Sequence, residues 1–528
     1  MFQGGIWSKL QGYYKWYVLG LVSVGYILGE LGHYLIGTTS KVTAEYLHYG
    51  DKACMLNATH LHVAQLPQVC EKVNSSDICE SLTLNGTRYC EWGYSGLGLD
   101  YQVLAGPAFM AVFTVVGVII GVIADKFNRA RILSGCTAVF VVAILLMGSV
   151  TEYWHLVVLR MLMAAGEAGC NPLATGILTD LFPEHQRALV LSIFNWGIYG
   201  GYGIAFPVGR YIPDLNAWGL SWRVCYYGAG VVGVVIAALT ALTLREPERT
   251  TIGEEGAAPS KGKDAALESG KKMPQVTIWH VIAQPRVLLL CLAASIRHCG
   301  GMCFAYNADL YYRDYFPDVD LGWWLFAVTV GIGSVGVVVG GVVSDKFVAR
   351  MGVRSRVLVL ALSQLISTLP AFGSVVFGPL WAMITLAFSY FFAEMWFGIV
   401  FAILVEIVPV SVRSTTVGVF LFVMNNVGGN LPILVDPVSK AIGYREAIMI
   451  FYAGFYGISS ILFFLTMFLM DGPAPAEEQS GAGGGARGGA RGGAQGADNR
   501  AFSQDESTLP ARGGGGGGGR LPVDNSKL

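Results

Sequence analysis

A small set of ionisable side chains lies well inside long apolar runs of this sequence. Charged groups in such surroundings are costly to bury and are usually functional. A buried carboxyl can remain neutral by binding a proton, whereas a guanidinium keeps its charge and needs an anionic partner. These residue types therefore predict a site that exchanges protons and holds an anion. The set consists of Glu30, His33, Arg160, Glu167, Arg297, His298, Asp309 and Glu394.

The spacing of Arg160 and Glu167 separates their roles. Seven residues are about two helical turns, so the two side chains share a face but lie roughly 10 Å apart along the axis. Arg160 therefore needs a partner from another helix or a substrate anion, and Glu167 is the candidate for proton binding. We predict a substrate and proton site made of Glu30, His33, Arg160, Glu167, Arg297 and Glu394.

Each of these residues also has a structural interpretation. The arginines and glutamates could form interhelical ion pairs. His33, one turn from Glu30, could relay a proton or only hydrogen-bond to it. Asp309 is near the end of its apolar run, where a solvated position would explain it.

Composition shows what must position these side chains. The chain has 528 residues, of which 53% are hydrophobic and 13% charged, and its mean hydropathy is +0.53. A soluble domain carries about 25% charged residues. Runs of about 20 apolar residues cross the hydrocarbon core of a bilayer, and only helices satisfy their backbone there. We expect an all-α polytopic membrane protein with twelve transmembrane helices, at 16–38, 99–124, 132–150, 154–178, 188–209, 222–244, 286–312, 321–344, 355–378, 380–405, 413–434 and 446–470. We interpret the first as a span rather than a cleaved signal.

The two halves of the chain repeat each other. Gly121 to Phe127 (GVIADKF) matches Gly341 to Phe347 (GVVSDKF), and Glu167 falls opposite Glu394. Asp180, Pro183 and Arg187 match Glu406, Pro409 and Arg413 in the same order. Parallel repeats of this kind are typical of transporters with substrate at the repeat interface. The predicted segments are an N-terminus 1–15, six-helix repeats 16–244 and 286–470, a linker 245–285 and a disordered Gly-rich tail 471–528.

Basic residues give the expected orientation. They follow the second and eighth runs and populate the linker, which places these segments and both termini in the cytosol. The loop 39–98 is then outside, where its sequons Asn57, Asn74 and Asn85 are glycosylation candidates. Its cysteines, Cys54, Cys70, Cys79 and Cys90, are expected to form two disulfides in an oxidising compartment, with three pairings possible.

One loop resembles a known family. Gly121 to Arg131 (GVIADKFNRAR) is similar to the G-x-x-x-D-[RK]-x-G-[RK]-[RK] loop of the major facilitator superfamily, with Asn128 in place of glycine. The resemblance implies the major facilitator fold and loops that contact the opposite half to steady the outward-facing state. The alternative is a plain basic cytosolic loop. The implied gating residues are Gly121, Asp125, Lys126, Arg129, Asp180, Arg187, Gly341, Asp345, Lys346, Glu406 and Arg413.

A narrower resemblance points to the spinster family. It rests on Arg160 to Ala168 (RMLMAAGEA), Asp180 to Phe182 and Arg245 to Arg249 (REPER), whereas Gly32-His33-Tyr34 departs from the family's Asp-Arg-Tyr. The resemblance implies export of lysophospholipids or sphingoid phosphates. It also implies that the first, fourth, seventh and tenth spans line the cavity, and these are the spans that carry the buried charges.

These observations predict a secondary active transporter, coupled to protons or another gradient, for an anionic or zwitterionic amphiphile. A carrier of a water-soluble organic anion and a receptor or scaffold without transport remain alternatives. We expect no enzymatic activity, no cofactor and no metal, because no nucleotide-binding loop or metal-ligand spacing occurs. The expected partners are a small-molecule or lipid substrate, protons and the bilayer, without nucleic acid, for a monomer in the plasma membrane or an endosomal or lysosomal membrane.

Overall fold

The computed structural model describes most of the membrane part of the chain. The residues described are 3–56, 70, 73, 75–84, 87–88, 90–247, 278–316, 319–351, 353–409 and 412–471. For 3–12, 125–126, 184–185, 188, 278–279, 348–351, 413–414 and 471 only the backbone is described. The sequons at Asn57, Asn74 and Asn85, most of the predicted linker and the Gly-rich tail lie outside the described residues.

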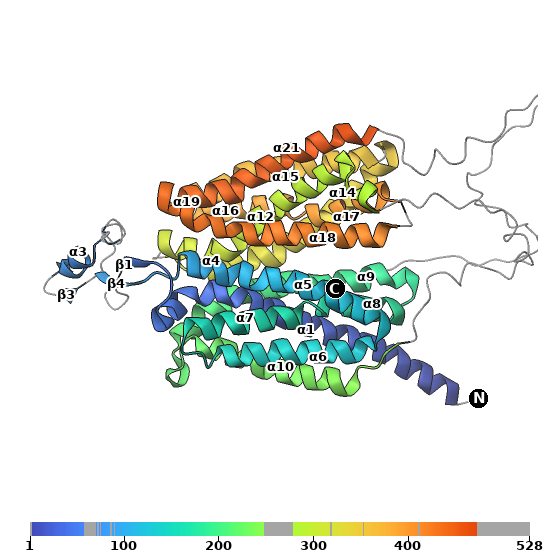
Figure 1. Ribbon diagram of the computed structural model, residues 1–528, viewed down its shortest axis with the longest axis horizontal. Helices are drawn as coiled ribbons and strands as arrows, with labels where there is room; N and C mark the ends of the chain where they lie inside the picture. Colours follow the sequence, from blue (N-terminus) through green and yellow to red (C-terminus); the bar gives the residue numbers. More distant parts are fainter. Residues whose placement is uncertain are drawn as a thin grey trace, which may run out of the picture. The chain divides into compact units, whose positions relative to one another are not determined.

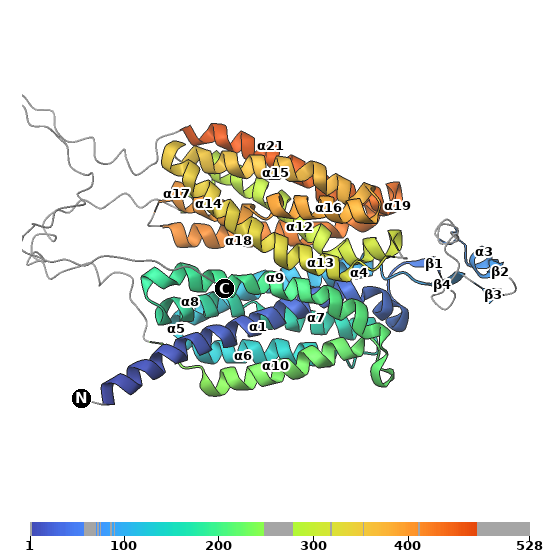
Figure 2. The same cartoon turned by 180° about the vertical axis from the view of Figure 1, so that it is seen from behind.

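Helices of the N-terminal half form one layered group (Figures 1 and 2). They run alternately between two ends of the bundle. We call the end next to residues 48–98 the loop end, and the end next to residues 244–247 the linker end. The helices are α1 (Gln3–Leu47), α4 (Leu99–Ala105), α5 (Pro107–Lys126), α6 (Arg129–Met147), α7 (Tyr153–Glu167), α8 (Cys170–Leu181), α9 (Glu184–Asp214), η2 (Ala217–Gly219) and α10 (Arg223–Thr243).

The C-terminal half forms a second group beside the first (Figure 1). It contains two π-helical segments, η3 and η6, within apolar spans. Its elements are α11 (Ile278–Ile282), α12 (Pro285–Tyr315), α13 (Gly322–Phe326), η3 (Ala327–Gly333), α14 (Ser334–Met351), α15 (Val353–Val376), α16 (Pro379–Ala393), α17 (Trp396–Ile407), α18 (Arg413–Asn430), η5 (Leu431–Leu434), α19 (Val435–Ile442), α20 (Tyr444–Ile448), η6 (Met449–Gly454), α21 (Phe455–Phe468) and η7 (Leu469–Asp471).

Eleven helical segments of the described chain are long and apolar enough to cross a membrane. The predicted span 154–178, which carries Arg160 and Glu167, is not in that group, and its helix is interrupted: α7 ends at Glu167 and α8 begins at Cys170. The tenth span is interrupted at the equivalent place, between Ala393 and Trp396. The all-α polytopic fold is therefore confirmed. The fourth span breaks beside the buried Glu167 and the tenth beside the partly buried Glu394.

The two halves meet along several helix pairs. Across this interface α1 packs on α12, α5 on α18, α9 on α13 and η3, and α4 on α19 and η5. The apolar clusters cross this interface: the N-terminal cluster takes in Met302, Tyr306 and Leu310 of α12, and one C-terminal cluster takes in Tyr202 and Phe206 of α9. The halves therefore share packing along α12 and α9.

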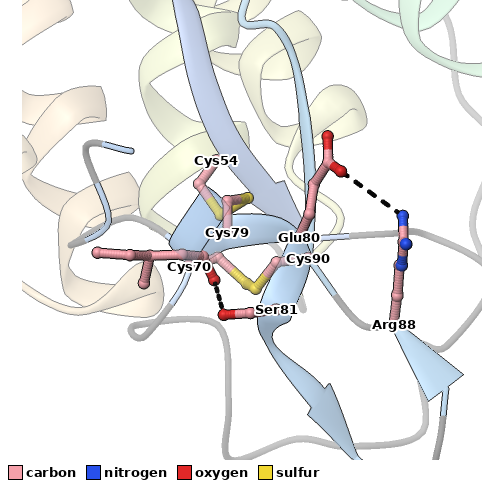
Figure 3. The surroundings of a disulfide bond; sticks show 8 residues. Cys54, Cys70, Cys79, Glu80, Ser81, Arg88 and Cys90 are labelled. Carbon is pink, nitrogen blue, oxygen red and sulfur yellow. Dashed lines mark hydrogen bonds and ion pairs between the residues drawn. A yellow bond between two sulfur atoms is a disulfide. The ribbon is translucent and has the colours of Figure 1, made fainter. Parts of the chain in front are cut away.

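A small disulfide-bonded subdomain projects at the loop end (Figures 1 and 3). Strands β1 (Lys52–Leu56) and β4 (Cys90–Tyr94) form an antiparallel ribbon, and β2 (Thr83–Leu84) pairs with β3 (Thr87–Arg88). Disulfides join Cys54 to Cys79, which lies on α3 (Ser76–Ser81), and Cys70 to Cys90. The two predicted disulfides are present, and the structure selects one of the three pairings.

Candidate functional site

The break in the fourth span places Glu167 against α1. Glu167 is the last residue of α7, and its side chain lies beside the backbone of Gly29. The nearest donor atoms of Glu30, His33 and Glu167 all lie within 4.8 Å of one another, close enough to share a proton or a cation. In the part of the chain that the structure describes, Oε2 of Glu167 and Nε2 of His33 have no hydrogen-bond partner. Three of the predicted residues therefore form one cluster, in which Glu167 and His33 each have an unsatisfied polar atom.

Arg160 lies next to this cluster, with its guanidinium fully buried. Nε donates to the carbonyl of Leu104 and Nη1 to that of Gly32, both at 3.2 Å. The guanidinium carbon lies 4.5 Å from the centre of the Phe109 ring. Among the described residues no carboxylate forms an ion pair with Arg160, and Nη2 has no hydrogen-bond partner. Its charge is therefore held by dipoles and a π face and is not neutralised.

Arg297, on α12 in the other half, has a different environment. It forms an ion pair with Glu394 at 3.2 Å and donates to the Ala393 carbonyl at 2.8 Å. The Gln364 side chain accepts from its Nε at 2.9 Å. Trp396 and Tyr456 cover its two faces at 4.7 and 4.5 Å. Arg297 thus occupies the break of the tenth span, where it satisfies a carbonyl that the broken helix leaves free.

Glu394 connects this group to the N-terminal half. Its other oxygen accepts from the hydroxyl of Tyr199 on α9 at 3.1 Å. Other side-chain hydrogen bonds between the halves include those from Trp196 to Ser334 at 2.7 Å and from Asn426 to Thr114 at 2.8 Å. Arg297 and Glu394 are therefore part of an interhelical network as well as candidates for substrate contact.

Two weaker candidates are structural. Asp309 is not solvated, contrary to the simplest interpretation of its position. It is buried and forms ion pairs with Arg313 at 2.7 Å and Arg210 at 3.5 Å. His298 packs against Trp396, with ring centres 6.0 Å apart.

Ion pairs between the halves lie at the loop end. Lys41 of α1 pairs with Asp314 of α12 at 3.4 Å, and Lys440 pairs with Asp51 at 2.9 Å. Arg210 on α9 reaches the C-terminal half through Asp309 and through Asp320, at 3.4 Å. In the described residues the halves are therefore tied together by charge at this end.

At the linker end, the described ion pairs stay within one half. Arg129 binds Asp180 at 2.6 Å and Glu246 at 2.8 Å. In the other half Arg356 binds Asp345 at 2.7 Å and Glu406 at 2.9 Å. The repeat that matches Asp180 with Glu406 thus extends to the arginines that bind them. Arg129 lies in the first turn of α6 and Arg356 in the first turn of α15, which are the third spans of their halves.

The carboxyl group of Glu246 has a lowered pKa. Burial alone would raise its pKa, but hydrogen bonds from the Arg129 side chain and the Ala130 amide, with the nearby charge of Arg129, hold the pKa of Glu246 below its ordinary value. This residue was not among the predicted gating residues, although it lies in the Arg245 to Arg249 motif.

The remaining gating residues have varied positions. Arg187 donates to the carbonyls of Thr179 and Phe182 within its own half. Gly121 lies in α5, and Gly341 and the exposed Lys346 lie in α14. The side chains of Asp125, Lys126 and Arg413 are outside the described part, so their gating role stays a prediction.

Comparison with known proteins places this arrangement in a family. The family model described as Major Facilitator Superfamily matches residues 22–433, which is most of the chain. The chain belongs to the major facilitator superfamily. The twelve-span repeat and the loop motif that resembled this family are therefore explained by membership, and the protein is a multi-pass integral membrane protein.

Within the superfamily, the chain is similar to spinster proteins. It is 32% identical over 157 residues to the sphingosine-1-phosphate transporter SPNS2 of Danio rerio, a match that covers 29% of this chain and 30% of the relative. It is 30% identical over 171 residues to protein spinster homolog 1 of Homo sapiens, covering 31% of each. The chain thus matches about three tenths of the length of these relatives, which confirms the resemblance without extending to their whole length.

Solved structures agree on the fold. A bacterial homolog of the human lysosomal transporter Spinster, in an inward-facing and unoccupied conformation, has a TM-score of 0.64 at 19% identity and covers 88% of this chain and 99% of its own. The xylose transporter XylE of E. coli, in an inward open conformation, has a TM-score of 0.59 at 14% identity and covers 85% of this chain and 95% of its own.

Proposed function

We propose that this protein is a secondary active transporter that works by alternating access, with the loop end outside and the linker end in the cytosol. In this orientation the described ion pairs between the halves lie on the outer side, and the described ion pairs at the cytosolic end lie within single halves. These contacts support an inward-facing state. A substrate at the level of the interrupted spans would be released to the cytosolic side or taken up from it.

The environment of Arg160 supports a substrate with an anionic head group, which this arginine would bind. A buried guanidinium cannot lose its charge, and this one has a free Nη2 and no carboxylate partner among the described residues. Arg297 is already paired with Glu394, so the N-terminal half carries the available positive charge. We propose a lysolipid or sphingoid phosphate as substrate, in accord with the spinster resemblance.

Glu167 and Glu30 support coupling to protons. Two carboxylates and an imidazole within 4.8 Å cannot all carry charge in an apolar environment without large cost. Binding of one proton removes most of that cost, and opening to water allows the proton to leave. Arg160 donates to the carbonyl of Gly32, the residue before His33 of this cluster, so protonation and anion binding would influence each other.

Uptake by purified protein in proteoliposomes tests the proposal. Labelled sphingosine 1-phosphate and a lysophospholipid would be compared with a small carboxylate, with and without a pH gradient. We expect lipid transport that increases with the gradient and is lost in Arg160→Ala. Transport of the carboxylate alone would favour the soluble-anion alternative, and no transport of any compound with intact binding would favour a receptor.

A further inference from the structure

A second cavity, of about 400 Å³, lies at the loop end, away from the interrupted spans. The disulfide-bonded subdomain, whose disulfides Figure 3 shows, forms one wall, with Cys54 and Trp92. The loop ends of α1 and α4 form a second wall and those of α12 and α19 a third. A volume of this size suits a small organic molecule.

The charges on the cavity wall are balanced and belong to both halves. Lys41, Lys52 and Asp51 come from the N-terminal half, and Arg313, Asp314 and Asp436 from the C-terminal half. The pair Lys41–Asp314 is long, at 3.4 Å, and its side chains are 36% and 28% exposed. Opposite charges that are loosely paired and reached by solvent can exchange their partners for the ammonium and the anionic group of one ligand.

One polar atom on this wall is unsatisfied. Gln102 of α4 is 2% exposed, and its Nε2 donates to Oδ1 of Asn307 at 3.0 Å. Its Oε1 accepts no hydrogen bond within the described part of the chain. A buried acceptor is costly while it is unpaired, so a ligand that brings an N–H donor is favoured.

From these contacts we infer that the cavity is a binding site for a small zwitterion with a primary ammonium group, such as an amino acid. The ammonium binds the Asp314 carboxylate and Oε1 of Gln102, and the ligand's carboxylate binds Lys41 and Arg313. Tyr444 and Trp92 supply aromatic surface for an apolar side chain. This site is separate from the one proposed for substrate and protons.

Occupancy of this site would act on transport, a step that rests on the alternating access proposed above. Its walls come from both halves, and they separate when the loop end opens. A bound zwitterion therefore stabilises the state closed at the loop end and slows transport when it is present on that side.

Calorimetric titration of the full-length protein in lipid nanodiscs tests binding without reference to transport. The probes are phenylalanine, phenethylamine and phenylpropionate, which share a ring but carry both charges, only the ammonium or only the carboxylate. We expect phenylalanine to bind at least tenfold more tightly than either single-charge analogue. Equal affinities for the three, or no binding, would overturn the inference.

Variants locate the site. Asp314→Asn and Gln102→Leu should each raise the Kd for phenylalanine at least tenfold, because each removes one contact to the ammonium. The matched control is Asp320→Asn, since Asp320 also joins the halves at the loop end, through Arg210 and Tyr211, but does not line the cavity. The control should keep the affinity of the unaltered protein, and unchanged binding in the first two variants would refute the site. Phenylalanine binding in a protein that transports nothing would leave this inference intact and overturn only the proposed function.

Discussion

Replacing Arg160 with methionine separates a substrate-binding role from a structural one. The guanidinium gains two charge-assisted hydrogen bonds to carbonyls, worth about 1.5–3 kcal/mol each, and a desolvated contact with Phe109 worth about 2 kcal/mol. Against this gain of roughly 5–8 kcal/mol stands a desolvation cost of several kcal/mol for a fully buried cation. The two nearly cancel, and methionine fills much of the same volume.

We therefore expect Arg160→Met to leave the thermal unfolding midpoint almost unchanged or to raise it slightly. Binding of an anionic lipid should fall about tenfold to a hundredfold, which corresponds to the loss of one charge-assisted contact of about 1.5–3 kcal/mol. The assays are thermal unfolding in detergent and lipid binding in the same preparation. If Arg160 only holds neighbouring helices together, we expect the opposite result: a lower unfolding midpoint and unaltered lipid binding.

Arg297→Met is the matched control. Its removal leaves the Glu394 carboxylate without its cation, and breaking a partly buried pair in this way costs about 3–5 kcal/mol. The midpoint should fall by several degrees, and the double variant Arg297→Met/Glu394→Gln should recover much of the loss. If Arg160→Met and Arg297→Met destabilise the protein equally, the contrast drawn between the two arginines is wrong.

Three further predictions concern coupling, topology and pH. Glu167→Gln should keep substrate binding and exchange but lose accumulation driven by a pH gradient, as measured in proteoliposomes; full retention of that accumulation would make Glu30 or Glu394 the better candidate. Glycosidase treatment should shift the mass of protein from a eukaryotic host through Asn57, Asn74 and Asn85, and protease mapping of the 39–98 loop to the cytosol would contradict the orientation. Glu246 has a pKa below its ordinary value, so its pairing with Arg129 contributes stability above that ordinary value and loses it as the pH falls through the lowered one. Thermal unfolding between neutral and strongly acidic pH should therefore show a smaller acid-dependent loss in Glu246→Gln, and identical pH profiles would count against this pair.

The spans and their buried charges were predictable because hydrophobic length and isolated charge are properties of the sequence alone. The break at Glu167 was not, since the apolar run continues through Ala168 and Gly169 without a change in composition. The disulfide pairing also needed the structure, because it depends on the register of β1 against β4, which places Leu56 opposite Cys90.

The unequal environments of Arg160 and Arg297 could not be predicted either. The internal repeat makes the two halves look equivalent, and both arginines lie in apolar runs. Arg297 donates hydrogen bonds to Gln364 and the Ala393 carbonyl, and Glu394 neutralises its charge. These groups are distant in the sequence and are brought together only by packing of α12, α15 and α16. Only the structure singles out Arg160 as the candidate anion site, because Arg297 is paired with Glu394 and Arg160 has no carboxylate partner among the described residues.

The energetic balance at the loop end is compatible with a reversible switch. Lys440–Asp51 has side chains 53% and 45% exposed, and Lys41–Asp314 is also reached by solvent. Exposed pairs of this kind contribute about 0–1 kcal/mol each, so they close the loop end only weakly. A hundredfold change in the ratio of the two states needs about 2.8 kcal/mol, which one proton at Glu167 or one head group at Arg160 can supply if it binds the two states unequally. The more buried Arg210–Asp309 pair also joins the halves at the loop end, so the two exposed pairs are only part of the closure that a group at the interrupted spans must overcome.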